Sequence, residues 1–176
     1  MNVKWDITLR ADQLPNPIIE HSIELLPSNL INPSVEDLKK VFNTGKQSLK
    51  TWGRTSGVIN GTEPHWIGVF KQTPLHTDPA YPRYTHHLIL KADAFVLRGH
   101  NKIELPIFRG TYILLDTHSP HQLFALNKDA CWYFAVSMDS KIKLPKSETL
   151  PKLINYALNA PLLTPEILVQ NNGGRF

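Results

Sequence analysis

A succession of short apolar runs between about residues 57 and 140 limits the folds open to this chain more than any other feature. These runs are rich in Val, Ile, Tyr, Phe and Trp, and they read GVI, HWIGVF, THHLILKA, AFVLRG, KIELPIF, TYILLD, HQLFAL and CWYFAVSM. Turn-forming residues separate them, among them Asn60-Gly61 and Gly110. Many short strands at such spacing are typical of an antiparallel sandwich or barrel. We therefore expect a mainly β fold with its barrel core at about 57–140.

Helices are expected on both sides of this core. Ser34 and Asp37 stand at the N-cap and N3 positions of a helix, and apolar residues recur at helical spacing as far as Trp52. An apolar stripe that begins at Leu150, and the later Thr164-Pro165 pair, predict helices again. We expect an N-terminal helix at about 34–52 and C-terminal helices at about 148–172. The segment before them predicts one or two strands.

The size and composition of the chain are those of an ordinary globular protein. Its 176 residues are 41% hydrophobic and 19% charged, without repeats or long linkers, which predicts a single domain over 1–176. No apolar run reaches the roughly 18 residues of a membrane span, and the N-terminus lacks the apolar segment of a secretory signal. With one cysteine, Cys131, no intrachain disulfide can form. We expect a cytoplasmic protein without a membrane partner.

The net charge of +4 decides little about function. It fits a solvated surface as well as an anionic small ligand, and no nucleic-acid-binding motif is visible.

Three residues have the types and the spacing of metal ligands. His76 and Asp78 are two positions apart, so on an extended chain their side chains point to the same face. His121 opens the apolar run HQLFAL, on a strand that is distant in sequence and able to lie close in space. Two His and one carboxylate on one face of an ion leave coordination positions open, as non-haem Fe(II) oxygenases require. We predict that His76, Asp78 and His121 bind one divalent metal.

Other interpretations of these residues stay open. His76 and Asp78 could form a turn pair, with Asp78 capping the turn at Pro79, and His121 could be a buried core residue. His118 competes with His121 from the same loop. His121 is preferred because it begins an apolar strand and follows Asp116 at an Asp-x4-His spacing.

The adjacent histidines His86 and His87 must face opposite sides of a strand, so at most one points inward. His87 is the better inward candidate if Lys91, which has the same parity, also points inward. Aromatic residues that could line a cavity are Trp66, Tyr81, Tyr84 and Trp132.

On these motifs the chain resembles the Fe(II)/2-oxoglutarate-dependent dioxygenases, a superfamily with a double-stranded β-helix (jelly-roll, cupin-like) barrel. The resemblance covers about residues 65–140, with His-x-Asp at 76 and 78 and a Gly–strand–Asp-x4-His element at 110, 116 and 121. It implies that Fe(II) and the cosubstrate 2-oxoglutarate are used to hydroxylate a C–H bond. The substrate is not encoded, and candidates are a small metabolite, a protein side chain or a nucleobase. The oligomeric state is not encoded either.

The chain departs from the family where the far carboxylate of 2-oxoglutarate should be bound. Many members place an Arg or Lys shortly after the distal His, at the position that is Cys131 here, and Lys128 nearby is a poor substitute. In the branch of jumonji-type asparaginyl hydroxylases, the corresponding Lys would fall on Lys91. Arg83 is a rival because a guanidinium grips a carboxylate with two hydrogen bonds, and Tyr84 and Thr85 could add hydroxyl donors.

Arg98 and Arg109 are further options for the cosubstrate. The departure at Cys131 also keeps two other functions open. One is a cupin-type metalloprotein without 2-oxoglutarate, such as an isomerase or a cofactor-independent dioxygenase. The other is a non-catalytic barrel that serves as a binding module.

Overall fold

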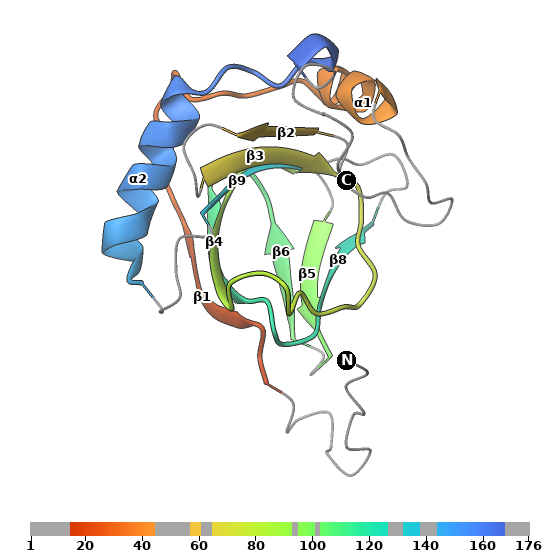
Figure 1. Cartoon of the computed structure of the whole chain (residues 1–176), viewed down its shortest axis with the longest axis vertical. Helices are drawn as coiled ribbons and strands as arrows, with labels where there is room; N and C mark the ends of the chain where they lie inside the picture. Colours follow the sequence, from red (N-terminus) through yellow and green to blue (C-terminus); the bar gives the residue numbers. More distant parts are fainter. Residues whose placement is uncertain are drawn as a thin grey trace.

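The structure, a computed structural model, describes residues 15–44, 57–60, 65–92, 95–100, 103–126, 132–137 and 144–167. The elements in these ranges are β1 (Ile18–Ile23), α1 (Val35–Thr44), β2 (Gly57–Asn60), β3 (His65–Phe70), β4 (Tyr84–Ala92), β5 (Phe95–Gly99), β6 (Glu104–Ile107), β7 (Thr111–Asp116), β8 (His121–Ala125), β9 (Trp132–Ser137) and α2 (Lys146–Asn159). Figure 1 looks into the barrel that the strands enclose, with α2 against its outside.

Two antiparallel sheets form the barrel. The larger sheet has the strand order β1-β7-β4-β9-β3-β2, and the smaller one has the order β6-β5-β8. An isolated antiparallel bridge between His76 and His121 adds the segment around His76 to the free edge of β8. From β3 onward the chain therefore passes back and forth between the sheets, and strands distant in sequence become neighbours. This order is that of a double-stranded β-helix of the jelly-roll and cupin type, which confirms the predicted fold.

The strands of the larger sheet bury apolar residues on both faces. Along β4, Leu88 and Leu90 belong to the outer cluster beneath the helices, whereas Ile89 belongs to the inner cluster between the two sheets. This alternation follows from the two-residue period of a strand. Helix α2 contacts β3, β4 and β9 and covers the outer face. The inner face is shared with the smaller sheet, and it contains the cavity described below.

The helices begin near the predicted positions. The Ser34 hydroxyl accepts a hydrogen bond from the Asp37 amide (3.1 Å), which confirms the predicted cap of α1. The structure describes α1 to Thr44, and the predicted remainder to residue 52 lies outside the described residues. Helix α2 begins at Lys146 rather than at 148, because the apolar stripe marks the buried face and not the exposed first turn.

After α2, a single turn at 165–167 follows the predicted Thr164 cap, whose hydroxyl accepts from the Ile167 amide (3.3 Å). Residues 168–172 lie outside the described residues. At the N-terminal end of the chain, β1 is the strand predicted before residue 34, and it pairs with β7 at the sheet edge. In the described ranges, no helix has the length and apolar character needed to cross a membrane.

Gly110 fixes the start of β7. Its φ is +91°, a conformation that side-chain-bearing residues rarely adopt, and a Cβ there would lie 2.7 Å from the carbonyl oxygen of Glu24. The turn predicted at Gly110 thus allows β1 and β7 to approach one another.

Candidate metal centre

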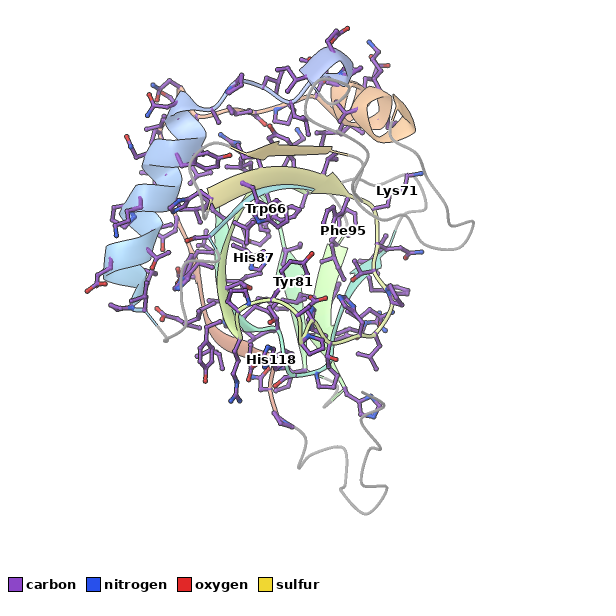
Figure 2. All side chains as sticks on the ribbon, viewed as in Figure 1. Trp66, Lys71, Tyr81, His87, Phe95 and His118 are labelled. Atoms are coloured by element: carbon purple, nitrogen blue, oxygen red, sulfur yellow. The ribbon has the colours of Figure 1, made fainter. Side chains whose placement is uncertain are left out.

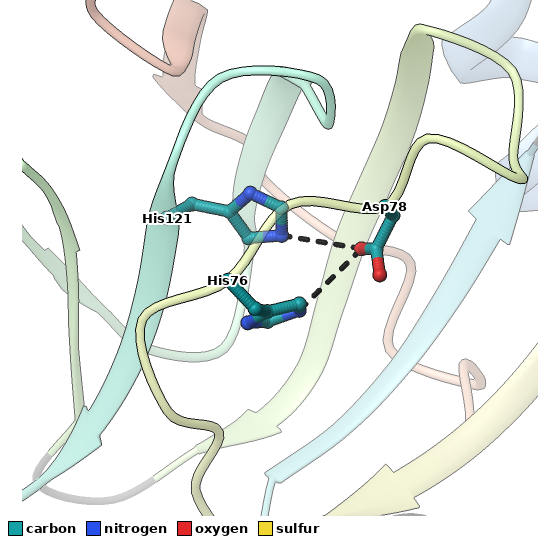
Figure 3. A group of neighbouring side chains, drawn as sticks. All are labelled: His76, Asp78 and His121. Atoms are coloured by element: carbon teal, nitrogen blue, oxygen red, sulfur yellow. Dashed lines mark ion pairs between the residues drawn. The ribbon is translucent and has the colours of Figure 1, made fainter. Parts of the chain in front are cut away.

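His76, Asp78 and His121 converge on one point of the barrel wall. The Nε2 atoms of His121 and His76 lie 3.3 Å and 3.5 Å from the same oxygen of Asp78, Oδ2 (Figure 3). One ligand atom from each residue can be chosen so that all three lie within 4.8 Å of one another. Ligand atoms about 2.1 Å from an ion and at right angles around it are about 3.0 Å apart, so the observed spacing is close to that of a metal site.

Backbone pairing explains why residues so far apart in sequence meet. The His76 amide donates to the His121 carbonyl (3.0 Å) and the His121 amide donates to the His76 carbonyl (2.9 Å). Residues paired in this way across antiparallel strands have side chains on the same face. The Asp78 amide donates to the Thr117 carbonyl (2.8 Å), which holds Asp78 against the loop that precedes His121.

The second nitrogen of each imidazole is held by the backbone. His76 Nδ1 lies 2.6 Å from the Pro74 carbonyl oxygen, and His121 Nδ1 lies 2.9 Å from the Ser119 carbonyl oxygen. A carbonyl only accepts hydrogen bonds, so each Nδ1 carries a proton, and Nε2 is the nitrogen of each ring that faces Asp78. Histidines that bind metals commonly donate their other N–H to a carbonyl in this way. Both Nε2 atoms are therefore prepared as ligands.

The carboxylate of Asp78 is ionised in this setting. Burial raises its pKa, but hydrogen bonds with His121 and His76 outweigh burial and hold the pKa well below the usual value. An ionised carboxylate and the Nε2 atoms of two imidazoles, gathered at one point, form a donor set that suits a divalent cation. The residues present fit the predicted metal, and its binding remains a prediction.

Asp116 organises the loop that carries His121. It is buried, and it accepts hydrogen bonds from the Ser119 hydroxyl (3.1 Å), the His118 amide (3.1 Å) and Arg83 (3.1 Å from Nη2). In the sequence, Asp116 was used only for its Asp-x4-His spacing to His121. Its spacing to Ser119 was the available signal for this supporting role.

A cavity of about 340 Å³ lies inside the barrel next to the three residues. Its aromatic wall includes Trp66, Phe70 and Phe134, and the ring of Phe134 meets the other two edge to face at 5.4 Å and 5.0 Å. Figure 2 shows Trp66 and His87 inside the barrel. Among the predicted lining aromatics, Trp66 and Tyr81 line the cavity. Sequence reasoning missed Phe70. Thr85, expected only as a possible hydroxyl donor to the cosubstrate, lines the cavity on the same face of β4 as His87.

The neighbouring histidines behave as their parity predicts. His87 lines the cavity, whereas His86 faces outward, where its Nδ1 lies 2.7 Å from the Tyr112 hydroxyl. His118, the alternative to His121, is exposed, and its Nε2 lies 3.0 Å from the Tyr81 carbonyl oxygen. The structure therefore brings His121, and not His118, to His76 and Asp78.

Lys91 does not share the face of His87, so that expectation is wrong. The register of β4 against β9 shifts between Ile89 and Lys91, which breaks the alternation of faces. After the shift Lys91 pairs with Tyr133 of the outer cluster, and Ala92 belongs to the inner cluster. The parity argument failed because a single irregular residue exchanges the faces of everything that follows it.

The other predicted cosubstrate residues also lie elsewhere. Arg83 is half-exposed and forms an ion pair with Asp116, and Tyr84 packs against the outer cluster. Arg98 lies 3.5 Å from Glu104 and over the ring of Phe124. Arg109 donates to backbone carbonyls, those of Ile31 (2.7 Å), Leu90 (2.6 Å) and Leu30 (3.2 Å). Lys128, Cys131 and the side chain of Trp132 lie outside the described residues.

No protein-family model matches the chain, and no curated protein matches it. Similar solved structures include a cupin domain from Bordetella pertussis Tohama I (10% identity, TM-score 0.40, 53% of this chain and 100% of that chain). Others are an RmlC-like cupin family protein with a double-stranded β-helix fold from Methanocaldococcus jannaschii (19%, 0.37, 53% and 84%) and apo-HppE (13%, 0.36, 65% and 61%). At such identities and TM-scores the likeness carries no information about the chemistry of the site, and the strand order alone identifies the fold.

Proposed function

We propose that this protein is a mononuclear metal enzyme, an Fe(II)-dependent oxygenase that oxidises a small molecule held in the barrel cavity. The observation that carries the proposal is the convergence of His76 Nε2, His121 Nε2 and the Asp78 carboxylate at the wall of a cavity of about 340 Å³. Two imidazoles and one carboxylate on one side of an ion leave its other side open to the cavity. Oxygenases need that space for dioxygen and a substrate.

The residues of the chain would hold the metal and shape its surroundings. His76 and His121 would bind as neutral imidazoles, because each Nδ1–H is committed to a carbonyl. Asp78 would supply the single negative charge. The aromatic wall of Trp66 and Phe134 would keep water away from the reacting group. Bound Fe(II) would supply the redox chemistry of dioxygen, which no side chain can provide.

A dependence on 2-oxoglutarate is the second candidate. It is supported by the ligand set, which the 2-oxoglutarate dioxygenases share. Against it, none of the described residues that line the cavity is Lys or Arg. The far carboxylate of 2-oxoglutarate would then be buried without a cation, which is unfavourable in an apolar environment. We therefore rank oxidation without 2-oxoglutarate first.

Anaerobic titration with Fe(II), followed by addition of 2-oxoglutarate and then of dioxygen, tests this ranking. We expect one Fe(II) per chain and no visible charge-transfer band with 2-oxoglutarate. We also expect that 2-oxoglutarate does not stimulate dioxygen uptake. A band together with stimulated uptake would support the second candidate, and failure to bind Fe(II) would support a non-catalytic binding module.

A further inference from the structure

Two polar side chains on the cavity wall lack the partners that buried polar groups normally have. Thr85 and His87 lie on the same face of β4, and both line the cavity. Thr85 is fully buried and its Oγ1 has no hydrogen-bond partner. Nδ1 of His87 has no partner of good hydrogen-bond geometry, although the ring interacts weakly with the Thr85 backbone. Unsatisfied buried polar atoms are uncommon in proteins, because each costs about 1–3 kcal/mol. Their position beside the candidate metal site points to a ligand that would satisfy them.

We propose that Thr85 and His87 form a neutral subsite that binds an uncharged polar group of the substrate, such as an amide, a carbonyl or a hydroxyl. This inference rests on the proposed function, in which the cavity holds the substrate. Both side chains can adjust to a ligand. Rotation about χ1 exchanges the hydroxyl and methyl of Thr85, and a ring flip exchanges the two edges of the His87 imidazole.

The charges around the subsite select against an ionised group. Burial lowers the pKa of His87 to about 3, so the imidazole is neutral at pH 7. A neutral imidazole offers one donor and one acceptor, and a threonine hydroxyl offers both. None of the described residues that line the cavity is a Lys or Arg that could balance the charge of an anion. Asp78 also adds a negative charge to the same cavity.

The remaining wall selects an apolar body. Beside Thr85 and His87 the cavity is lined by aliphatic residues of β7, Ile113 and Leu115, and by the aromatic rings already described. A volume of about 340 Å³ lies at the small end of the range for ligand sites. The substrate class that fits is a small, uncharged molecule with a hydrocarbon or aromatic body and one polar group.

Binding of two matched probes to the metal-free protein tests the subsite. Benzamide and benzoate have the same ring and differ in charge, and a chelator keeps benzoate from binding through a metal. In NMR titrations we expect benzamide to bind at least about tenfold more tightly than benzoate. Thr85→Val should weaken benzamide about three- to tenfold, the loss of one hydrogen bond. Thr85→Ser, which keeps the hydroxyl, should restore the affinity.

Thr149→Val is the matched control. Thr149 also has a buried hydroxyl without a partner, but it belongs to α2 on the outer face and does not line the cavity. Its substitution should leave benzamide binding unchanged. Three results would overturn the subsite: benzoate binding as tightly as benzamide, Thr85→Val binding benzamide like the wild type, or Thr149→Val losing as much affinity as Thr85→Val.

These titrations separate the subsite from the proposed function. They are made without metal. Binding of benzamide through Thr85 by a protein that never binds Fe(II) would therefore support the subsite and contradict the proposed oxygenase. Binding of Fe(II) without a preference for benzamide over benzoate would support the proposed oxygenase and contradict the subsite.

Discussion

His86 and His87 are neighbours in sequence, yet they face two regions of the molecule that differ in kind. His86 lies on the outer face of the larger sheet, where Tyr112 is its partner and helix α2 covers the strands. His87 lies on the inner face, beside the cavity and the candidate metal ligands, and its Nδ1 has no partner. Both faces contain buried polar atoms without a partner, among them Nε2 of His86 and Nδ1 of His87, but those of the inner face border a cavity.

This difference indicates that the outer face of the larger sheet mainly stabilises the barrel and that the inner face mainly serves binding. A closed apolar layer supplies the free energy of folding, because buried surface and dense packing are what stabilise a fold. An open cavity with unsatisfied polar groups lowers stability and is kept where a ligand is to be bound. Substitutions on the outer face should therefore change the free energy of unfolding, and substitutions on the inner face should change binding.

The largest effect is expected at His121. Replacing it by Ala leaves two ligands, so the affinity for Fe(II) or Mn(II) should fall by more than about 100-fold while the fold is kept. Metal content after dialysis, with circular dichroism as a check on folding, measures this. His118→Ala is the matched control from the same loop and should retain the metal. Equal retention by both variants would remove His121 from the site.

The second contrast compares two leucines. Leu153 of α2 is fully buried in the outer cluster, whereas Leu97 of β5 lines the cavity. Leu153→Ala should lower the free energy of unfolding by about 3 kcal/mol, because it opens a new void. Leu97→Ala should cost only about 1–2 kcal/mol, because it enlarges an existing cavity. Urea denaturation distinguishes the two, and a larger loss at Leu97 would reverse the assignment of the faces.

The pH dependence of stability sharpens the account of His86. Burial lowers its pKa from 6.5 to about 4, so in this range the unfolded state binds a proton that the folded state does not. The contribution of neutral, buried His86 to the free energy of unfolding is fully present above pH 6.5. It is lost as the pH falls from 6.5 toward 4, by up to about 1.4 kcal/mol per pH unit. His86→Gln should reduce the slope of the free energy of unfolding against pH by up to about 1.4 kcal/mol per pH unit, which corresponds to one proton. Urea denaturation between pH 4.5 and 7 provides the slopes, and an unchanged slope would contradict the burial of His86.

The smallest effect is expected at Arg83. Its side chain is half-exposed and is engaged by Asp116 outside the cavity, so Arg83→Gln should leave Fe(II) affinity and any binding of 2-oxoglutarate unchanged. Calorimetric titration of both ligands checks this expectation. A selective loss of 2-oxoglutarate binding would return Arg83 to the role considered from the sequence.

Local patterns predicted those features that depend on residues close in sequence. The Ser34 cap and the Gly110 turn needed only neighbouring residues. The shared direction of His76 and Asp78 followed from their spacing, and the approach of His121 followed from the expectation of paired strands. These predictions succeeded because the period of a strand and the spacing of ligands are properties of short segments.

Features that depend on distant partners could not be predicted. The ion pair of Arg83 with Asp116 and the position of Lys91 both required the tertiary structure. In particular, nothing in the residues THHLILKA marks the register shift after Ile89 that turns Lys91 outward. The same limit applies to Thr85, whose lack of a partner is visible only once the cavity is formed.

The most direct test of the central claim is a crystal structure of the protein grown with Mn(II), with the metal located by its anomalous scattering. The account predicts one ion bound by Nε2 of His76, Nε2 of His121 and a carboxylate oxygen of Asp78, with its remaining positions facing the cavity. An ion bound elsewhere, or none at this point of the barrel wall under saturating Mn(II), would contradict it.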